Sequence, residues 1–290
     1  MSFPIYSIRI LGVLITAALF LFSKNNQTWT SWVYALGFGH YLISLVYSKK
    51  QITNVMDQAR CYLPFGLAAF TGAALYFNKL PLVLYFGFHH AFNETYILNR
   101  EFPVEKYGGL KAMRTSSAFL NFFCYLAVLQ HMPELQFLNI ALLRTGMLVS
   151  ALFFFYFLNT LGKSFKPQEL LENCAFEIIG LLLVAVSFYE NITFLQIVCY
   201  HFIFWMLFPL SKMWTFSKKR IPAYLTLTTG LLTAFILLSP VGLFSYKLWP
   251  SHYAKQFILW SYIHITVSFA LSDAHPSWVT RWFQPVKTSA

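Results

Sequence analysis

The chain alternates between long apolar segments and short polar linkers. Each segment holds 17 to 24 mostly apolar residues, and a helix of about 20 such residues crosses the roughly 30 Å hydrocarbon core of a bilayer. The pattern predicts an all-α fold, a polytopic transmembrane helix bundle of about ten spans, with residues 1–290 forming a single integral-membrane domain. The first segment lacks an Ala-x-Ala-like cleavage site, so we interpret it as a span rather than a signal peptide. The expected spans are residues 6–23, 30–48, 61–77, 80–98, 115–131, 135–157, 170–189, 192–211, 221–244 and 256–274.

Basic residues in the linkers alternate in the way that ten spans require. The linkers after the second, fourth, sixth and eighth spans hold 13 Lys and Arg, whereas those after the first, third, fifth, seventh and ninth hold four. Cytoplasmic loops of membrane proteins are enriched in these residues. The alternation therefore supports the number of spans independently of hydropathy, and it predicts that both termini are cytoplasmic.

Composition agrees with a membrane location. Hydrophobic residues make up 58% of the chain and charged residues 11%, against about 25% charged in soluble proteins. We therefore exclude a soluble globular protein, a disordered chain and a nucleic-acid-binding domain. The net charge of +11 is assigned to cytoplasmic loops and anionic lipid head groups, so membrane lipids are expected partners and nucleic acid is not. A bacterial inner membrane and a eukaryotic endomembrane fit equally well.

Five histidines fall inside the expected spans, where ionisable residues are costly and usually functional. The four spans that carry them run in the same direction, and each His lies 8 to 10 residues from the start of its span. At about 1.5 Å rise per residue, all five lie within one or two helical turns of a common depth. The sequence therefore predicts one layer of metal ligands near the membrane midplane. The residues are His40, His89, His90, His201 and His264.

Two acidic residues accompany this layer. Glu94 lies four residues after His90, on the same helix face, and Glu177 lies about two turns into the seventh span. Carboxylates often orient a metal-bound imidazole through its second ring nitrogen, so both are candidate catalytic residues in this role. An ion pair with a loop cation for Glu94 and a helix-bridging hydrogen bond for Glu177 are the alternatives.

An imidazole-rich site without thiolates suits iron, copper or zinc. Iron(II) is the leading expectation because open coordination positions suit oxygen chemistry; copper, zinc and haem stay open. A buried site favours lipid-soluble substrates that arrive laterally from the bilayer. The HxxxH and HxxHH clusters of desaturases are absent from the sequence, and residues 256–274 lack the Schiff-base Lys of a microbial rhodopsin.

Two short motifs resemble those of the Brp/Blh family, membrane-embedded carotenoid-cleaving dioxygenases that make retinal from β-carotene. The run GFGHYLIS at 37–44 is similar to a GxPHGxxD motif, and HHAFNE at 89–94 resembles an HFGxxD-like motif. His201 and His264 correspond to later family histidines. Ser44 replaces the Asp of the first motif, and Trp205 stands where a second His would follow His201.

The resemblance implies a bundle of apolar helices around a single iron. Together with the common depth of the histidines it leads to our hypothesis: an iron-dependent dioxygenase acting on a carotenoid or another apolar lipid or isoprenoid. His40, His89, His201 and His264 would hold the ion, with His90 as an alternative ligand or outer partner. A proton-coupled transporter or channel and a haem- or quinone-linked electron-transfer subunit are the alternatives.

Overall fold

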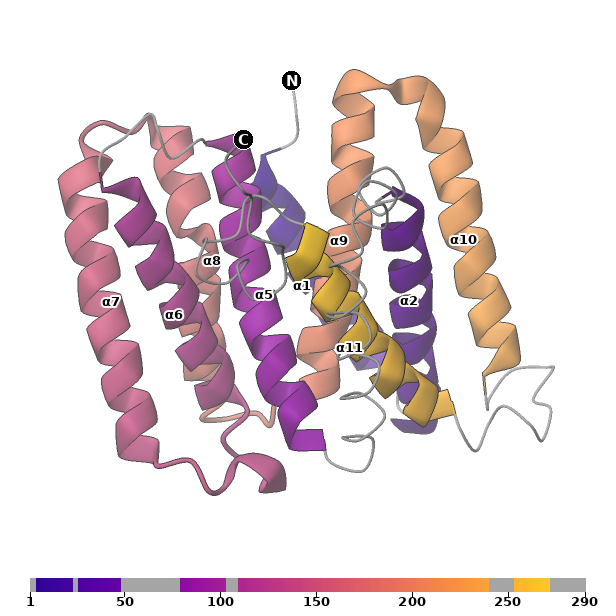
Figure 1. Ribbon diagram of the computed structural model, residues 1–290, viewed down its shortest axis with the longest axis horizontal. Helices are drawn as coiled ribbons and strands as arrows, with labels where there is room; N and C mark the ends of the chain where they lie inside the picture. Colours follow the sequence, from indigo (N-terminus) through magenta and orange to yellow (C-terminus); the bar gives the residue numbers. More distant parts are fainter. Residues whose placement is uncertain (1–3, 23–25, 48–78, 103–108, 240–252, 272–290) are drawn as a thin grey trace, which may run out of the picture. The chain divides into compact units, whose positions relative to one another are not determined.

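All regular secondary structure in the described part of the chain is helical (Figure 1), which confirms the predicted all-α class. The computed structural model describes residues 4–22, 26–47, 79–102, 109–239 and 253–271. A helix occurs at every predicted segment except 61–77, which lies outside the described residues. The helices are α1 (Ile5–Phe22), α2 (Asn26–Tyr47), α5 (Lys79–Glu101), α6 (Leu110–Val128), α7 (Ile140–Gly162), α8 (Pro167–Val186), α9 (Phe194–Phe216), α10 (Ile221–Leu238) and α11 (Tyr253–Leu271), with short 3-10 helices η3 (Pro133–Leu135) and η4 (Lys218–Arg220).

The start of α7 differs from the predicted boundary for a reason that the structure shows. The sequence places it at residue 135, but the helix begins at Ile140. Asn139 is the reason, because its side-chain oxygen accepts hydrogen bonds from the backbone N–H groups of Ala141 (2.8 Å) and Leu142 (3.4 Å). A capped N–H pair of this kind defines a helix N-terminus, and apolar periodicity alone does not reveal it.

The chain forms two compact units, a finer division than the single predicted domain. Unit 1 comprises residues 1–77, 194–271 and 283–290, and unit 2 comprises residues 78–193 and 272–282. Charge is divided unequally between them. Unit 1 holds twelve Lys and Arg against Asp57 alone, whereas unit 2 holds nine Lys and Arg and nine Asp and Glu. The net charge of +11 therefore belongs entirely to unit 1.

In unit 1, α9 packs against α1 and α2, and α2 also packs against α10 and α11. Gly37 permits the close approach of α2. A Cβ at this position would overlap the Phe257 ring of α11 and lie 2.8 Å from the Phe202 ring of α9. Because His40 lies one turn after Gly37, this close packing brings its side chain toward both neighbouring helices.

In unit 2, α6 packs against α5, α7 and α8. Arg114 lies near the start of α6 and is 2% exposed. Its guanidinium donates to Asn99 Oδ1 (3.0 Å), the Phe102 carbonyl (3.1 Å) and Asn173 Oδ1 (3.3 Å). Arg114 is one of the 13 Lys and Arg that the sequence pattern assigned to linkers between spans. The structure corrects that assignment, because this residue joins α5, α6 and α8 from inside the unit.

Three of the described helices are long and apolar enough to cross a membrane: α7, α9 and the segment formed by η4 and α10. Only 17% of the apolar window in α7 and 6% of that in the η4–α10 segment is buried within the protein. Exposed apolar surfaces of this extent are uncommon on soluble monomers. Their length and exposure favour association with a membrane.

Candidate metal centre

Three of the five predicted ligands meet inside unit 1. His40 comes from α2, His201 from α9 and His264 from α11, and one ring nitrogen of each lies within 4.8 Å of the other two. We call these residues the His cluster. His40 and His201 are 6% and 1% exposed, and His264 is half-buried, so the imidazoles converge largely inside the unit.

The spacing within the His cluster fits a single ion. Two nitrogens, each about 2.1 Å from one metal, lie about 3.0 Å apart at a right angle and about 3.4 Å apart at the tetrahedral angle. The Nε2 atoms of His40 and His264 are 3.1 Å apart, which is the separation of adjacent ligands. Two nitrogens 4.8 Å apart, the upper limit within the cluster, would have to approach by about 1.4 Å at the tetrahedral angle and by about 1.8 Å at a right angle.

Ser44 determines which nitrogen of His264 faces the cluster. The Ser44 hydroxyl donates to the Tyr41 carbonyl (2.8 Å), and its oxygen lies 3.1 Å from Nδ1 of His264. A hydroxyl has one hydrogen, so Ser44 accepts a hydrogen bond from Nδ1–H. In neutral imidazole this leaves a lone pair on Nε2 of His264, which accepts a hydrogen bond from His40 Nε2 at 3.1 Å and is the form that a metal ligand requires.

Aromatic rings surround the cluster. The Tyr41 ring stacks on His264 with a centroid separation of 4.8 Å, and its hydroxyl lies 2.6 Å from Ser261 Oγ. The Phe202 ring is 5.3 Å from His40, and the Trp205 ring is 6.3 Å from His201. These contacts fix the imidazole orientations and make the surroundings of the cluster apolar.

The donor set of unit 1 is unusual in lacking carboxylates. The described residues of this unit contain no Asp or Glu, since Asp57 lies outside them. An ion held by the His cluster would therefore keep its full positive charge. Neutral nitrogen donors suit iron(II), copper or zinc and not magnesium or calcium, so the residues present fit the predicted group of metals.

His89 and His90 belong to unit 2, on α5. His89 Nε2 lies 2.9 Å from the side-chain nitrogen of Asn93, which donates, so this nitrogen of His89 accepts. The ring of His90 lies parallel to that of Phe86 at 5.9 Å and edge-on to Phe176 at 5.4 Å. These two histidines and the His cluster belong to different units, so the inclusion of His89 and His90 in a shared site stays a prediction.

Both candidate acids are also in unit 2 and are buried, Glu94 with 3% and Glu177 with 1% of its surface exposed. Ser117 Oγ donates to Glu177 Oε1, and the same oxygen accepts from Asn121 Nδ2 at 3.3 Å. Glu177 therefore joins α8 to α6, in line with the alternative of a helix-bridging hydrogen bond. The catalytic assignment of Glu94 and Glu177 stays a prediction.

Several residues of these sites were not identified from the sequence. Ser44 entered only as a departure from a motif and Tyr41 only as part of the run 37–44, while Ser261, Ser117 and Asn121 did not enter at all. Ser44 follows His40 by one helical turn, which is a usable signal for a nearby partner. The residue it contacts is His264, however, 220 positions away, and no local pattern predicts that pairing.

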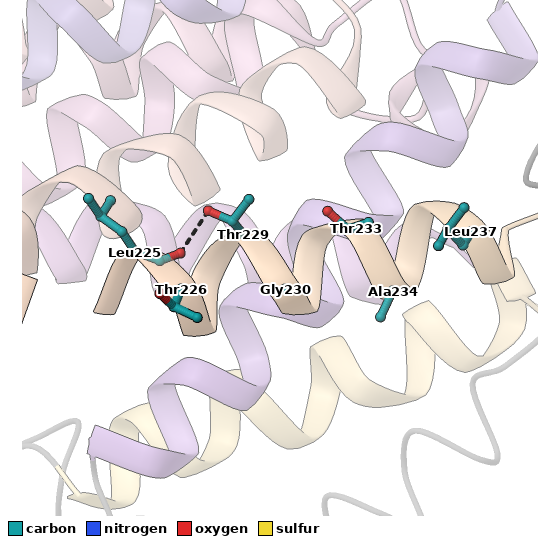
Figure 2. Close-up of a pocket in the computed structure, with 7 residues that line it drawn as sticks. All are labelled: Leu225, Thr226, Thr229, Gly230, Thr233, Ala234 and Leu237. Carbon is teal, nitrogen blue, oxygen red and sulfur yellow. Dashed lines mark hydrogen bonds between the residues drawn. The ribbon is translucent and has the colours of Figure 1, made fainter. Parts of the chain in front are cut away.

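A surface groove runs along α10 and includes no residue of the His cluster (Figure 2). Leu225, Thr226, Thr229, Gly230, Thr233, Ala234 and Leu237 line it. All come from a single helix, so the groove is open on its other side. Thr229 Oγ1 donates to the Leu225 carbonyl at 2.7 Å, which satisfies the hydroxyl within the helix, as expected for a surface facing lipid.

Comparison of the chain with protein-family models, with curated proteins and with solved structures finds no match. The resemblance to the Brp/Blh family therefore depends on the motif residues alone.

Proposed function

We propose that this protein is a multi-pass integral membrane metalloenzyme that holds one iron(II) through the His cluster and oxidises an apolar lipid or isoprenoid. The observation that carries this proposal is the convergence of three imidazoles from three separate helices in an aromatic interior. Three protein ligands are typical of catalytic metal sites because they leave coordination positions open.

The membrane arrangement that we propose has about ten spans with both termini in the cytoplasm. Support comes from a helix at each of the nine predicted segments that the structure describes. Three of these described helices meet the length and apolarity required for crossing, and the basic linkers alternate as the arrangement requires. A bacterial inner membrane or a eukaryotic endomembrane would provide the lipid phase from which substrate enters.

Bound iron would supply the oxygen chemistry, with the resemblance to carotenoid-cleaving dioxygenases as the guide to the reaction type. The chain's own residues would bind the ion, set the tautomer of a ligand and exclude water. His40, His201 and His264 bind the ion, and Ser44 keeps the proton of His264 on Nδ1, away from the metal. The rings of Phe202 and Trp205 exclude water, which strengthens electrostatic interactions at the ion.

A compact ion fits this cluster better than a haem held between His40 and His264. Axial histidines bind haem from opposite faces, so the macrocycle must lie between the two rings. The rings of His40 and His264 are in direct edge-to-face contact, with centroids 4.7 Å apart and an angle of 70°. This contact leaves no space for a porphyrin between them.

Elemental analysis of the protein purified in mild detergent tests the proposal. We expect about one iron per chain, together with extractable isoprenoid or other apolar lipid, and loss of the metal in His201→Ala. Substoichiometric amounts of every transition metal, in protein that elutes as a single folded species, would refute it. A Soret band would instead identify the haem-linked alternative.

A further inference from the structure

The turn between α9 and α10 brings several features to one end of a helical hairpin in unit 1. The two helices lie antiparallel in Figure 1 and are joined through Ser217 and η4. The Ser217 N–H donates to the Met213 carbonyl (2.8 Å), and the Arg220 N–H donates to the Ser217 carbonyl (2.9 Å). Tyr224 is 2% exposed and donates to the Met206 carbonyl of α9 at 2.7 Å. The turn is thus held firmly against both helices.

The location of this turn follows from the lengths of the helices. At about 1.5 Å rise per residue, the 23 residues of α9 extend about 34 Å, and the segment formed by η4 and α10 is also long enough to cross a bilayer. If both helices cross, their connection lies at a membrane surface, whichever side that is.

Positive charge is concentrated at this turn. Lys218, Lys219 and Arg220 are consecutive and all exposed, and Lys212 lies on the last turns of α9. The sequence contains no Asp or Glu between Glu190 and Asp273. The described residues of unit 1 therefore contain no carboxylate for Lys218, Lys219 and Arg220, and these exposed side chains are accessible to an external anion.

Aromatic side chains lie beside these cations. Trp214 is 50% exposed and Phe216 is 78% exposed. Lys218 Nζ lies 5.4 Å from the centroid of the Trp214 ring, and Lys212 Nζ lies 5.5 Å from that of Phe208. Trp prefers the head-group level of a bilayer, so its contact with Lys218 holds an ammonium group at the depth of lipid phosphates.

We propose that this basic turn, formed by Lys212, Trp214, Phe216 and residues 218–220, binds the phosphate of anionic phospholipid head groups. A cluster of four basic residues directly beside a spanning helix attracts anionic lipid. Loop charges that serve only to orient the chain need neither neighbouring rings nor ordered backbone. The proposal rests on the membrane-spanning part of the proposed function and is independent of the metal.

Native mass spectrometry of the detergent-solubilised protein, titrated with phosphatidylglycerol or phosphatidylcholine, provides the test. The variant Lys218→Gln/Lys219→Gln/Arg220→Gln should bind phosphatidylglycerol about 100-fold more weakly, since each of the three basic residues contributes about fivefold. Phosphatidylcholine binding should be unchanged. The matched control is Lys111→Gln/Lys163→Gln/Lys166→Gln, which removes three exposed charges from unit 2 and should bind like the unmodified protein.

Equal loss in both triple variants, or no loss in the first, would overturn the proposal. Displacement of phosphatidylglycerol by millimolar inorganic phosphate would overturn it too, because the site would then recognise free phosphate. Should the triple variant fold poorly, Lys219→Gln and Arg220→Gln alone should each weaken binding about fivefold. Resistance of the unmodified protein to alkaline carbonate extraction tests membrane insertion separately, so that a failure of that premise is distinguishable from a failure of lipid binding.

Discussion

Removal of the Ser44 hydroxyl is the sharpest test of the proposed metal centre. In Ser44→Ala, the Nδ1–H of His264 loses the acceptor that lies 3.1 Å away. A buried donor without a partner costs about 1–3 kcal/mol. The imidazole avoids this cost by moving its proton to Nε2, but that nitrogen then no longer binds metal. Loss of such an outer hydrogen bond typically lowers metal affinity about 10- to 100-fold, which corresponds to about 1.4–2.7 kcal/mol.

The assay is competition for iron(II) between the anaerobic, detergent-solubilised protein and a chelator of known affinity. Ser211→Ala is a matched control, because Ser211 on α9 makes the same kind of bond to a carbonyl three residues earlier, that of Phe208 (2.8 Å). Ser44→Ala should lose affinity while Ser211→Ala keeps it, and Ser44→Thr should retain most of it because the oxygen remains. Equal affinities for Ser44→Ala and the unmodified protein would show that the hydroxyl does not set the tautomer.

The remaining predictions concern the ligands, the packing and the buried acid. Alanine at each residue of the His cluster should reduce bound metal to less than about a tenth, because three ligands leave no spare donor. Alanine at the exposed His131 should leave the metal content unchanged. Metal retained by all three cluster variants would contradict the site. Gly37→Ala should lower the free energy of unfolding by about 1–3 kcal/mol through overpacking. Gly39→Ala should leave it unchanged, because an added Cβ there meets nothing within 4 Å. Equal melting temperatures for the two variants would be inconsistent with the close approach of α2. Glu177→Ala should destabilise the protein by about 1–3 kcal/mol by leaving buried donors unsatisfied, and the exposed Glu190 is the control; a neutral result would mean that the contacts of this carboxylate add no stability.

The sequence was sufficient for the helical class because that class follows from local pattern. Apolar runs of about 20 residues fold as helices whether they face lipid or protein, and nine such runs are helical in the structure. Boundaries were less accurate where one side chain decides them, as Asn139 does for α7. The burial of Arg114 was also missed, because its partners Asn99 and Asn173 lie on other helices.

The candidate site was only partly within reach of the sequence. Equal depth along parallel spans selected a set of five histidines that includes His40, His201 and His264, the three that the structure brings together. Depth gives no information about the lateral position of a helix. The sequence therefore combined these three with His89 and His90, which the structure assigns to another compact unit.

By itself, the sequence determined that this protein is helical, rich in apolar segments, and carries imidazoles at similar positions along several of those segments. These properties depend on neighbours a few residues apart. The tertiary structure alone decided that three of the imidazoles converge, that Ser44 orients His264 from a distant part of the chain, and that the whole net charge belongs to one unit. Each of these depends on which helices pack together, and side-chain complementarity between distant segments, rather than local periodicity, specifies that packing.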